Sequence, residues 1–433
     1  MTRRQLLRLG LFQLTAGGLS VLFLGVLNRI LRVELGMDLF LVSLLIGGGH
    51  YLGALVAIPF GYFSDRHRIA GYRRTAYIIL GALVTALVLA LSPWVAVSLA
   101  DAPTSGRIVA AFGFFLLEGI STFIAGTAYL ALIADRTERK ERGQATGLVW
   151  TLLMLGIIAT GISAGLALNQ YRFDTFATMF VVGAVVAIIL SLIALWAQEP
   201  RVNEPVSPAT ASLREALGVV ARSQHSRSFA AFLLVSMFSY FMQDVILEPF
   251  GGEVFNLSPA ETTRFNAYIG VGLIFGMLYG GLRLIPQRGK RWVAGLGCWI
   301  IVVSFGGLSA SGFLHTARLL PIAIALLGLG AGFFTVGAVA LMMDMTLSAH
   351  TGLFVGAWTL VQALAKGPAS IIGGAMQSTL ISIGASPGQA YGTVFAFEAI
   401  GMLVAILILS RVVVQGFQHE VASFGKLAAE AIE

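Results

Sequence analysis

Long apolar stretches separated by short polar segments dominate the chain. Each stretch is about 20 residues long, the length that an α-helix needs to cross a hydrocarbon core of roughly 30 Å. We therefore predict an all-α polytopic membrane protein with twelve transmembrane helices. The predicted spans are 9–31, 39–60, 75–97, 108–134, 145–168, 175–197, 229–250, 265–285, 292–313, 317–343, 353–377 and 389–412.

Basic residues are distributed unevenly between the two sides of this arrangement. Of the 28 Lys and Arg residues, 21 lie on the side that holds both termini, 6 lie on the other side, and Lys366 lies within a span. Because Lys and Arg concentrate in cytoplasmic segments, we predict that both termini are cytoplasmic.

One long polar segment, residues 198–228, divides the spans into six and six. It contains Pro200, Pro205 and Pro208 and few large apolar residues, a composition typical of a linker. We predict an N-terminal six-helix bundle over 1–197, a cytoplasmic linker over 198–228, a C-terminal six-helix bundle over 229–412 and a cytoplasmic tail over 413–433.

The two predicted halves resemble each other at a constant offset. Five identities lie 209 positions apart, each at the same point of a helix–loop–helix: Asp135 and Asp344, Thr137 and Thr346, Gly143 and Gly352, Gly147 and Gly356, Gly165 and Gly374. Duplicated six-helix halves are the parallel repeat of major facilitator superfamily transporters. We predict that architecture here.

Composition narrows the class further. The chain is 57% hydrophobic and only 11% charged, whereas a soluble domain is about 25% charged. Its net charge of +7 follows from the topology and does not indicate nucleic-acid binding. A single cysteine, Cys298, excludes an intrachain disulfide and a cysteine metal cluster. The sequence has no P-loop, H-E-x-x-H or C-x-x-C motif and no G-x-S-x-G at a strand–helix turn, so we predict a protein that is not an enzyme.

Two short loops carry charged motifs that resemble the superfamily's loop signatures. A carboxylate in such a loop can cap a neighbouring helix or pair with Arg, which indicates a gating role; the alternative is simple retention of basic residues on the cytoplasmic side. The first loop contributes Gly61, Asp65, Arg66, Arg73 and Arg74, and the second contributes Asp135, Arg142 and Gly143.

Five ionisable side chains lie within predicted spans, where each costs at least a few kcal/mol. They are Glu118, Asp244, Glu248, Lys366 and Glu398. Asp244 and Glu248 are four residues apart, so their carboxylates share one helix face. Three interpretations stay open: structural pairing with Lys366, Arg29 or backbone, a proton relay, and contact with a ligand or partner.

The sequence neighbours of Glu248 and His50 bear on the roles of these two residues. Pro249, Gly251 and Gly252 follow Glu248, which favours a place for Glu248 near the membrane surface. His50 lies within a span directly after three glycines. Its imidazole is either hydrogen-bonded across helices or, because a neutral nitrogen ligates Mg and glycines admit a flat ring, an axial ligand to the metal of a flat macrocycle.

Several stretches resemble one branch of the superfamily, the bacteriochlorophyll-delivery (PucC/LhaA-type) family. They include Asn28-Arg29 through Glu34 to Gly36, the run from Gln243 to Phe255 with Thr262-Thr263, and Gly356-Ala357-Trp358. The resemblance covers essentially the whole chain. It implies a photosynthetic bacterium, and an inner, intracytoplasmic or thylakoid membrane. It also implies assembly of light-harvesting or photosystem complexes by handling chlorophyll or bacteriochlorophyll, with pigment and apoproteins as partners.

We predict that Gln243, Asp244 and Glu248 form with His50 and Glu118 the polar lining that receives a pigment or an antenna helix. The leading function is a non-enzymatic assembly factor in the lipid membrane. The alternative is a proton-coupled secondary transporter of a small molecule.

Overall fold

The structure is a computed structural model that describes residues 3–56, 60, 67–137, 142–168, 170–201, 224–344 and 351–412. Within these ranges the regular structure is helical, apart from one isolated bridge between Ile69 and Tyr72. The α-helices are α1 (Arg3–Ser20), α2 (Leu39–Ser43), α3 (Gly49–Leu52), α5 (Thr75–Asp101), α6 (Ser105–Arg136), α7 (Arg142–Ala167), α8 (Phe173–Leu195), α10 (Gln224–Phe241), α11 (Gln243–Phe255), α12 (Pro259–Tyr279), α13 (Ile285–Arg288), α14 (Lys290–Leu314), α15 (Leu320–Asp344), α16 (Thr351–Ser382) and α17 (Pro387–Leu409).

Eleven helical segments of the described chain are long and apolar enough to cross a membrane. The predicted span 353–377 falls within α16, a 32-residue helix that carries Lys366 and is not among the eleven. The all-helical membrane class is confirmed. The predicted linker and tail fall mostly on 202–223 and 413–433, outside the described residues, and α10 begins at Gln224, before the predicted start at 229.

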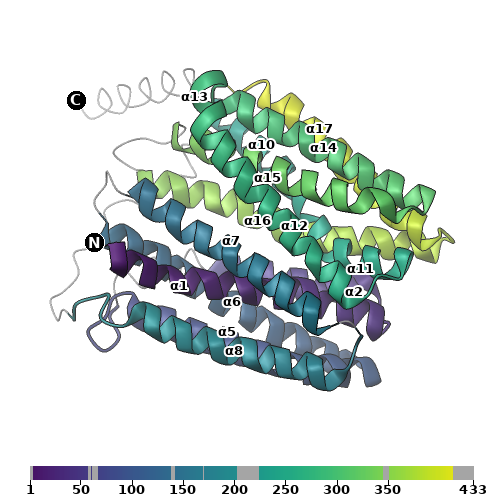
Figure 1. Ribbon diagram of the computed structural model, residues 1–433, viewed down its shortest axis with the longest axis horizontal. Helices are drawn as coiled ribbons and strands as arrows, with labels where there is room; N and C mark the ends of the chain where they lie inside the picture. Colours follow the sequence, from purple (N-terminus) through teal and green to yellow (C-terminus); the bar gives the residue numbers. More distant parts are fainter. Residues whose placement is uncertain are drawn as a thin grey trace, which may run out of the picture.

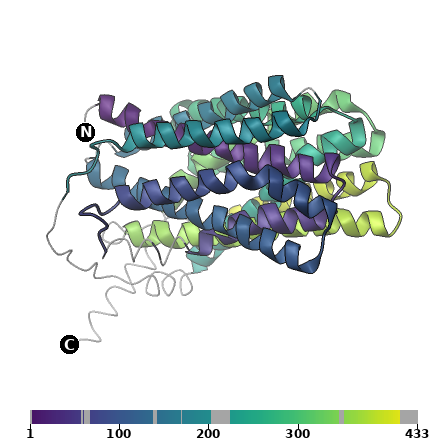
Figure 2. The ribbon, with the colours of Figure 1, turned by 90° about the horizontal axis from the view of Figure 1, so that it is seen from below.

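The helices form a bundle with nearly parallel axes (Figure 1). Helices of the first part of the chain pack on one another, with α1 against α7 and α8, and α5 against α6 and α8. Helices of the second part do the same, with α14 against α15 and α17. Contacts between α7 and α12, and between α2 and α16, join the two groups. The start of α1 and the end of α17 lie at the same end of the bundle (Figure 2).

Helix starts are defined by local capping. The Asp38 side chain accepts hydrogen bonds from the backbone N–H groups of Phe40 and Leu41 at the start of α2. Ser258 and Glu261 form a capping box at the start of α12, next to Pro259 in the first turn. Such residues satisfy backbone donors that have no partner within the helix.

The predicted first and second spans are not uniform α-helices. π-helical segments interrupt them at Val21–Leu27, Ile30–Glu34 and Leu44–Gly48. π-Helical turns widen the backbone locally and are frequent at functional sites. Here the three segments border the region where the two groups of helices meet.

Candidate functional site

A cavity of about 350 Å³ lies between the two groups of helices, bordered by Val21–Leu27, α7, α10, α11, α12, α15 and α16. Its aromatic wall comprises Trp150, Tyr240, Phe241, Phe265 and Phe334. Its polar wall comprises Gln243, Asp244, Glu248, Asn266, Gln362 and Lys366. A larger hollow of about 590 Å³ between α1, α7 and α8 contains none of the predicted binding residues. The smaller cavity is therefore the candidate site.

The polar wall begins where α10 gives way to α11, at Met242. Asp244 accepts one hydrogen bond from the Tyr51 hydroxyl and another from the Gln243 amide, whose nitrogen lies 2.6 Å from Oδ1. Tyr51 belongs to the first part of the chain and Asp244 to the second. Asp244 therefore lines the cavity and also ties the two groups of helices together.

Glu248 lies one turn further along α11. It is only 4% exposed, and its Oε1 accepts a hydrogen bond of 2.6 Å from the Asn266 amide. Glu248 is a buried acid, because α11 continues through Pro249 to Phe255 and packs this side chain inside the protein. A Cβ added to Gly25 would collide with Glu248 Oε1, so a glycine at position 25 permits this close approach.

Pro249 explains a further contact between the groups. Proline has no N–H, so it cannot donate to the carbonyl four residues earlier, that of Val245. The Asn28 amide donates to this carbonyl oxygen over 2.9 Å. A membrane-buried backbone group freed by a proline thus obtains its partner from another helix.

His50 and Glu118 form a second polar pair. The distance between His50 Nδ1 and Glu118 Oε2 is 2.7 Å, and Glu118 Oε1 accepts a hydrogen bond of 2.9 Å from Thr122. The pair does not line the cavity; its link to Asp244 runs through Tyr51, next in the chain to His50. The glycines that precede His50 face other helices, since a Cβ on Gly47 would meet Ser370 on α16.

The remaining ionisable residues of the predicted spans, Lys366 and Glu398, have different surroundings. The Lys366 ammonium lies 4.2 Å from the centroid of the Phe241 ring. Glu398 on α17 is fully buried, and neither carboxylate oxygen has a hydrogen-bond partner among the residues that the structure describes. The predicted structural pairing of Lys366 with an acid is therefore not a close ion pair.

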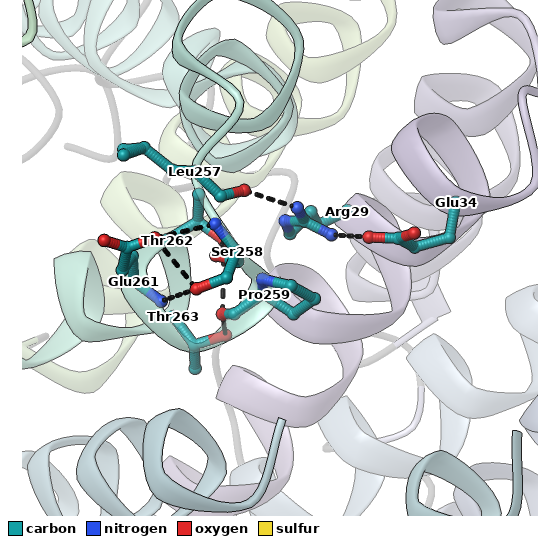
Figure 3. A network of polar contacts seen from close by, with 8 residues as sticks. All are labelled: Arg29, Glu34, Leu257, Ser258, Pro259, Glu261, Thr262 and Thr263. Atoms are coloured by element: carbon teal, nitrogen blue, oxygen red, sulfur yellow. Dashed lines mark hydrogen bonds and ion pairs between the residues drawn. The ribbon is translucent and has the colours of Figure 1, made fainter. Parts of the chain in front are cut away.

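Arg29 joins the groups at the end of the bundle where the first predicted span ends (Figure 3). Its guanidinium donates to Glu34 over 2.6 Å and to the Leu257 carbonyl over 2.8 Å. Leu257 directly precedes the Ser258 capping box, so the network holds the loop between α11 and α12 against the first helix.

A second arginine forms a parallel connection. Arg32 forms an ion pair with Glu253 of α11, and Glu253 Oε2 accepts a hydrogen bond of 3.0 Å from the Tyr391 hydroxyl. We call Arg29, Arg32, Glu253, Leu257 and Tyr391 the closing network. It connects the first helix to α11, to the loop after it and to α17.

The loop motifs are described only in part. Arg74 Nε lies 3.4 Å from Asp135 Oδ2, so residues of the two predicted gating loops lie together. Glu199 accepts hydrogen bonds from the backbone N–H groups of Arg73 and Thr75 and caps α5. Gly61, Asp65 and Arg66 lie outside the described residues, as does the side chain of Arg142, while Gly143 is described as part of the first turn of α7.

Sequence reasoning missed several members of the site: Asn28, Tyr51, Glu199, Glu253, Asn266 and Tyr391. Asn28 and Asn266 are polar residues within or beside apolar stretches, and that pattern was available from the sequence. The tyrosines could not be identified in this way. A tyrosine ring is common in an apolar helix whether or not its hydroxyl makes a polar contact.

Comparison with known proteins defines the family. The family model described as PUCC protein matches residues 26–417. The chain is 33% identical over 419 residues to the "Bacteriochlorophyll synthase 44.5 kDa chain" of Rhodobacter capsulatus, covering 94% of this chain and 95% of the relative. It is 32% identical over 437 residues to "Protein PucC" of Cereibacter sphaeroides, covering 94% and 91%.

Solved structures define the fold. A bacterial homologue of the human lysosomal transporter Spinster, in an inward-facing conformation, aligns with a TM-score of 0.69 at 16% identity, covering 96% of this chain and 97% of that one. A D-xylose–proton symporter aligns with a TM-score of 0.69 at 14% identity, covering 92% and 96%. The fold is that of the major facilitator transporters, and the chain belongs to the PucC family.

Proposed function

We propose that this protein is a non-enzymatic membrane factor for the assembly of light-harvesting or photosystem complexes, and that it binds or delivers chlorophyll or bacteriochlorophyll. The observation that carries the proposal is the cavity between the two groups of helices, which is lined by aromatic side chains together with Gln243, Asp244 and Glu248. Family membership supports it, because relatives bear the names of bacteriochlorophyll synthase chain and PucC.

His50 has the chemistry for a contact with the pigment's Mg. Its Nδ1 lies against a carboxylate, and a histidine that donates from one nitrogen to a carboxylate presents the lone pair of the other nitrogen to a metal. The Phe23, Tyr51 and Phe123 rings surround the imidazole, with centroids 5.0–5.9 Å away. We therefore propose that His50, held by Glu118, contacts the pigment. This contact lies next to the cavity and not inside it.

We also propose the membrane placement. Both termini face the cytoplasm, in an inner, intracytoplasmic or thylakoid membrane of a photosynthetic bacterium. The excess of Lys and Arg on the side of the termini supports this orientation. The partners are pigment and the apoproteins of the antenna or photosystem.

The test is complementation of a photosynthetic strain that lacks the protein. Wild-type protein should restore the accumulation of antenna complexes, measured from the absorption of isolated membranes. His50→Leu keeps volume but removes the nitrogen, so it should reach the membrane at the normal level and restore less antenna. Wild-type antenna content in the deletion strain would contradict the proposed function.

Proton-coupled transport of a small molecule is the second candidate. It is favoured by one observation, namely that two membrane-embedded carboxylates, Asp244 and Glu248, line a cavity on a transporter fold. Purified protein in proteoliposomes distinguishes the two candidates: a transporter moves a solute in response to a proton gradient, whereas an assembly factor purifies with pigment.

A further inference from the structure

Helix α3 contacts both groups of helices through two consecutive side chains. His50 lies against Glu118 of α6 in the first group, and the Tyr51 hydroxyl donates to Asp244 of α11 in the second. Both side chains are buried, with exposed fractions of 8% and 6%. Because successive residues of an α-helix point about 100° apart, this short element faces two carboxylates at once.

The length of α3 leaves its orientation to such contacts. The helix has only four residues, Gly49–Leu52, and follows the π-helical segment Leu44–Gly48. Its backbone packs closely on α6, since a Cβ added to Gly119 would lie 2.2 Å from the His50 carbonyl oxygen. Among the residues that the structure describes, its one hydrogen bond to the second group of helices is that of Tyr51. The Tyr51 hydroxyl therefore sets how α3 lies relative to α11.

Tyr51 lies directly behind the wall of the cavity. Its hydroxyl donates to Asp244, and its ring packs edge-to-face against Phe241, with the centroids 5.8 Å apart. Both partners line the cavity, whereas Tyr51 does not. The same ring packs edge-to-face against the His50 imidazole, with the centroids 5.0 Å apart. Tyr51 thus touches the cavity wall and the imidazole together.

The Asp244 carboxylate is arranged to hold Tyr51. Its Oδ1 accepts a hydrogen bond from Gln243, and its Oδ2 accepts the one from Tyr51. If either partner is removed, the other remains buried without it, and a buried polar group that loses its partner is costly. A change at this hydrogen bond should therefore alter the position of α3, and with it the position of His50.

We infer that Tyr51 is a positioning residue: its hydrogen bond to Asp244 fixes the His50 imidazole relative to the cavity, so the contact between His50 and the pigment's Mg depends on that bond. This inference rests on the proposed function and deepens it, because it names the residue that couples the cavity to the pigment contact. Tyr51 acts through His50 and has no contact of its own with the metal.

The test adds bacteriochlorophyll a to the purified full-length protein in detergent. The Qx absorption band of this pigment follows the number of axial ligands on Mg, so it reports the contact with His50. Tyr51→Phe keeps the ring and removes only the hydroxyl. This variant should shift the Qx band toward that of His50→Leu. It should also bind the pigment about threefold more weakly than wild type, or weaker still, a change that corresponds to part of the free energy of one hydrogen bond.

Substitutions at Asp244 test whether the hydrogen bond is the link. Asp244→Asn keeps an oxygen that can accept from Tyr51, so its Qx band should stay closer to that of wild type than the band of Asp244→Leu, which has no acceptor. Combining Tyr51→Phe with Asp244→Leu should shift the band no further than Asp244→Leu alone, because the bond is already absent.

Tyr129→Phe is the matched control. Tyr129 is another buried tyrosine of the first group, and its hydroxyl donates to the Leu9 carbonyl over 3.0 Å. It lies 11 residues beyond Glu118 on α6, about 16 Å along the helix axis. Both Tyr129→Phe and Tyr51→Phe should lower the melting temperature in detergent, but only Tyr51→Phe should change the Qx band. A merely structural role for Tyr51 would make the two variants alike.

A wild-type Qx band and wild-type affinity in Tyr51→Phe would overturn the inference, and so would an equal shift in Tyr129→Phe. Asp244→Asn that shifts the band as far as Asp244→Leu would also overturn it, because the retained acceptor would then have no effect. Wild-type protein that binds no bacteriochlorophyll a would overturn it too. The proposed function is judged separately, by antenna accumulation in the complemented strain.

Discussion

At the scale of single residues, the buried polar side chains divide into those that satisfy one another and those that do not. His50 and Glu118 form a complete pair, together with Thr122. Lys366 and Glu398 lack close partners among the described residues. Because an unpaired polar group is costly in a membrane protein, the second group indicates function, and in the first group Glu118 holds the His50 imidazole in place for its proposed contact with pigment.

The His50–Glu118 pair makes a thermodynamic prediction. Glu118→Leu should lower the free energy of unfolding by about 1–3 kcal/mol, because His50 and Thr122 lose a buried partner. Adding His50→Leu to that variant should cost less than His50→Leu costs in the wild-type protein, since the partner is already absent. Thermal melting of the three variants in detergent measures both effects. Additive losses would show that the two side chains do not interact.

Sequence reasoning reached part of this residue-scale description. The spacing of Asp244 and Glu248 predicted that both acids share one helix face, because helical periodicity is a local property, and both residues line the cavity. The partners Tyr51 and Asn266 were missed, since Tyr51 lies 193 residues before Asp244 and such a pairing depends on how the helices meet. Burial of Glu248 was also underestimated, because the proline after it does not end α11.

At the scale of elements, α11 is the helix on which the site depends. It contains Pro249 and still runs to Phe255, because Asn28 takes over the hydrogen bond that the proline cannot make. The first helix approaches it closely at Gly25. Hydropathy located both spans but not their interruptions, since a π-helical turn changes the register of a helix without changing its composition.

The hydrogen bond from Asn28 to the Val245 carbonyl of α11 can be tested by a pair of substitutions. Asn28→Leu should destabilise the protein by about 1–3 kcal/mol, because it leaves the Val245 carbonyl buried and unpaired. In a Pro249→Ala background the alanine N–H can bond to this carbonyl, so the same Asn28→Leu change should cost much less. Melting temperatures in detergent report the difference. An equal cost in both backgrounds would contradict the assigned role of Asn28.

The close approach of the first helix to α11 predicts the effect of a single methyl group. Gly25→Ala should destabilise the protein modestly, because the new Cβ would displace the buried Glu248 carboxylate from its hydrogen bond with Asn266. Gly113→Ala in α6 is the matched control: its Cβ would have no neighbour within 4 Å, and alanine favours a helix over glycine by up to about 1 kcal/mol. If both variants melt at the wild-type temperature, the helices do not meet as described.

At the scale of the whole molecule, the cavity lies between two groups of helices that the closing network holds together. The positions of most spans were accessible from the sequence, because hydropathy is a property of the chain itself. The closing network was not, since Arg32, Glu253 and Tyr391 come from three distant segments and Glu253 follows two glycines at an apparent helix end.

The closing network predicts rescue by exchange of charges. Arg32→Glu should reduce antenna accumulation and lower the free energy of unfolding by about 2 kcal/mol, because it places two carboxylates together. Arg32→Glu combined with Glu253→Arg restores opposite charges and should recover part of both losses. Membrane absorption and melting temperature measure the two effects. Failure of the exchange to recover either one would show that the contact is not an energetically coupled pair.

The central claim, that the protein handles pigment during complex assembly, is tested most directly by its visible absorption spectrum after purification from a photosynthetic membrane, together with the chains that purify with it. We predict bound chlorophyll or bacteriochlorophyll, antenna or photosystem apoproteins in the same fraction, and less pigment with the His50→Leu variant. A colourless protein without such partners that moves a solute across proteoliposomes would contradict the claim.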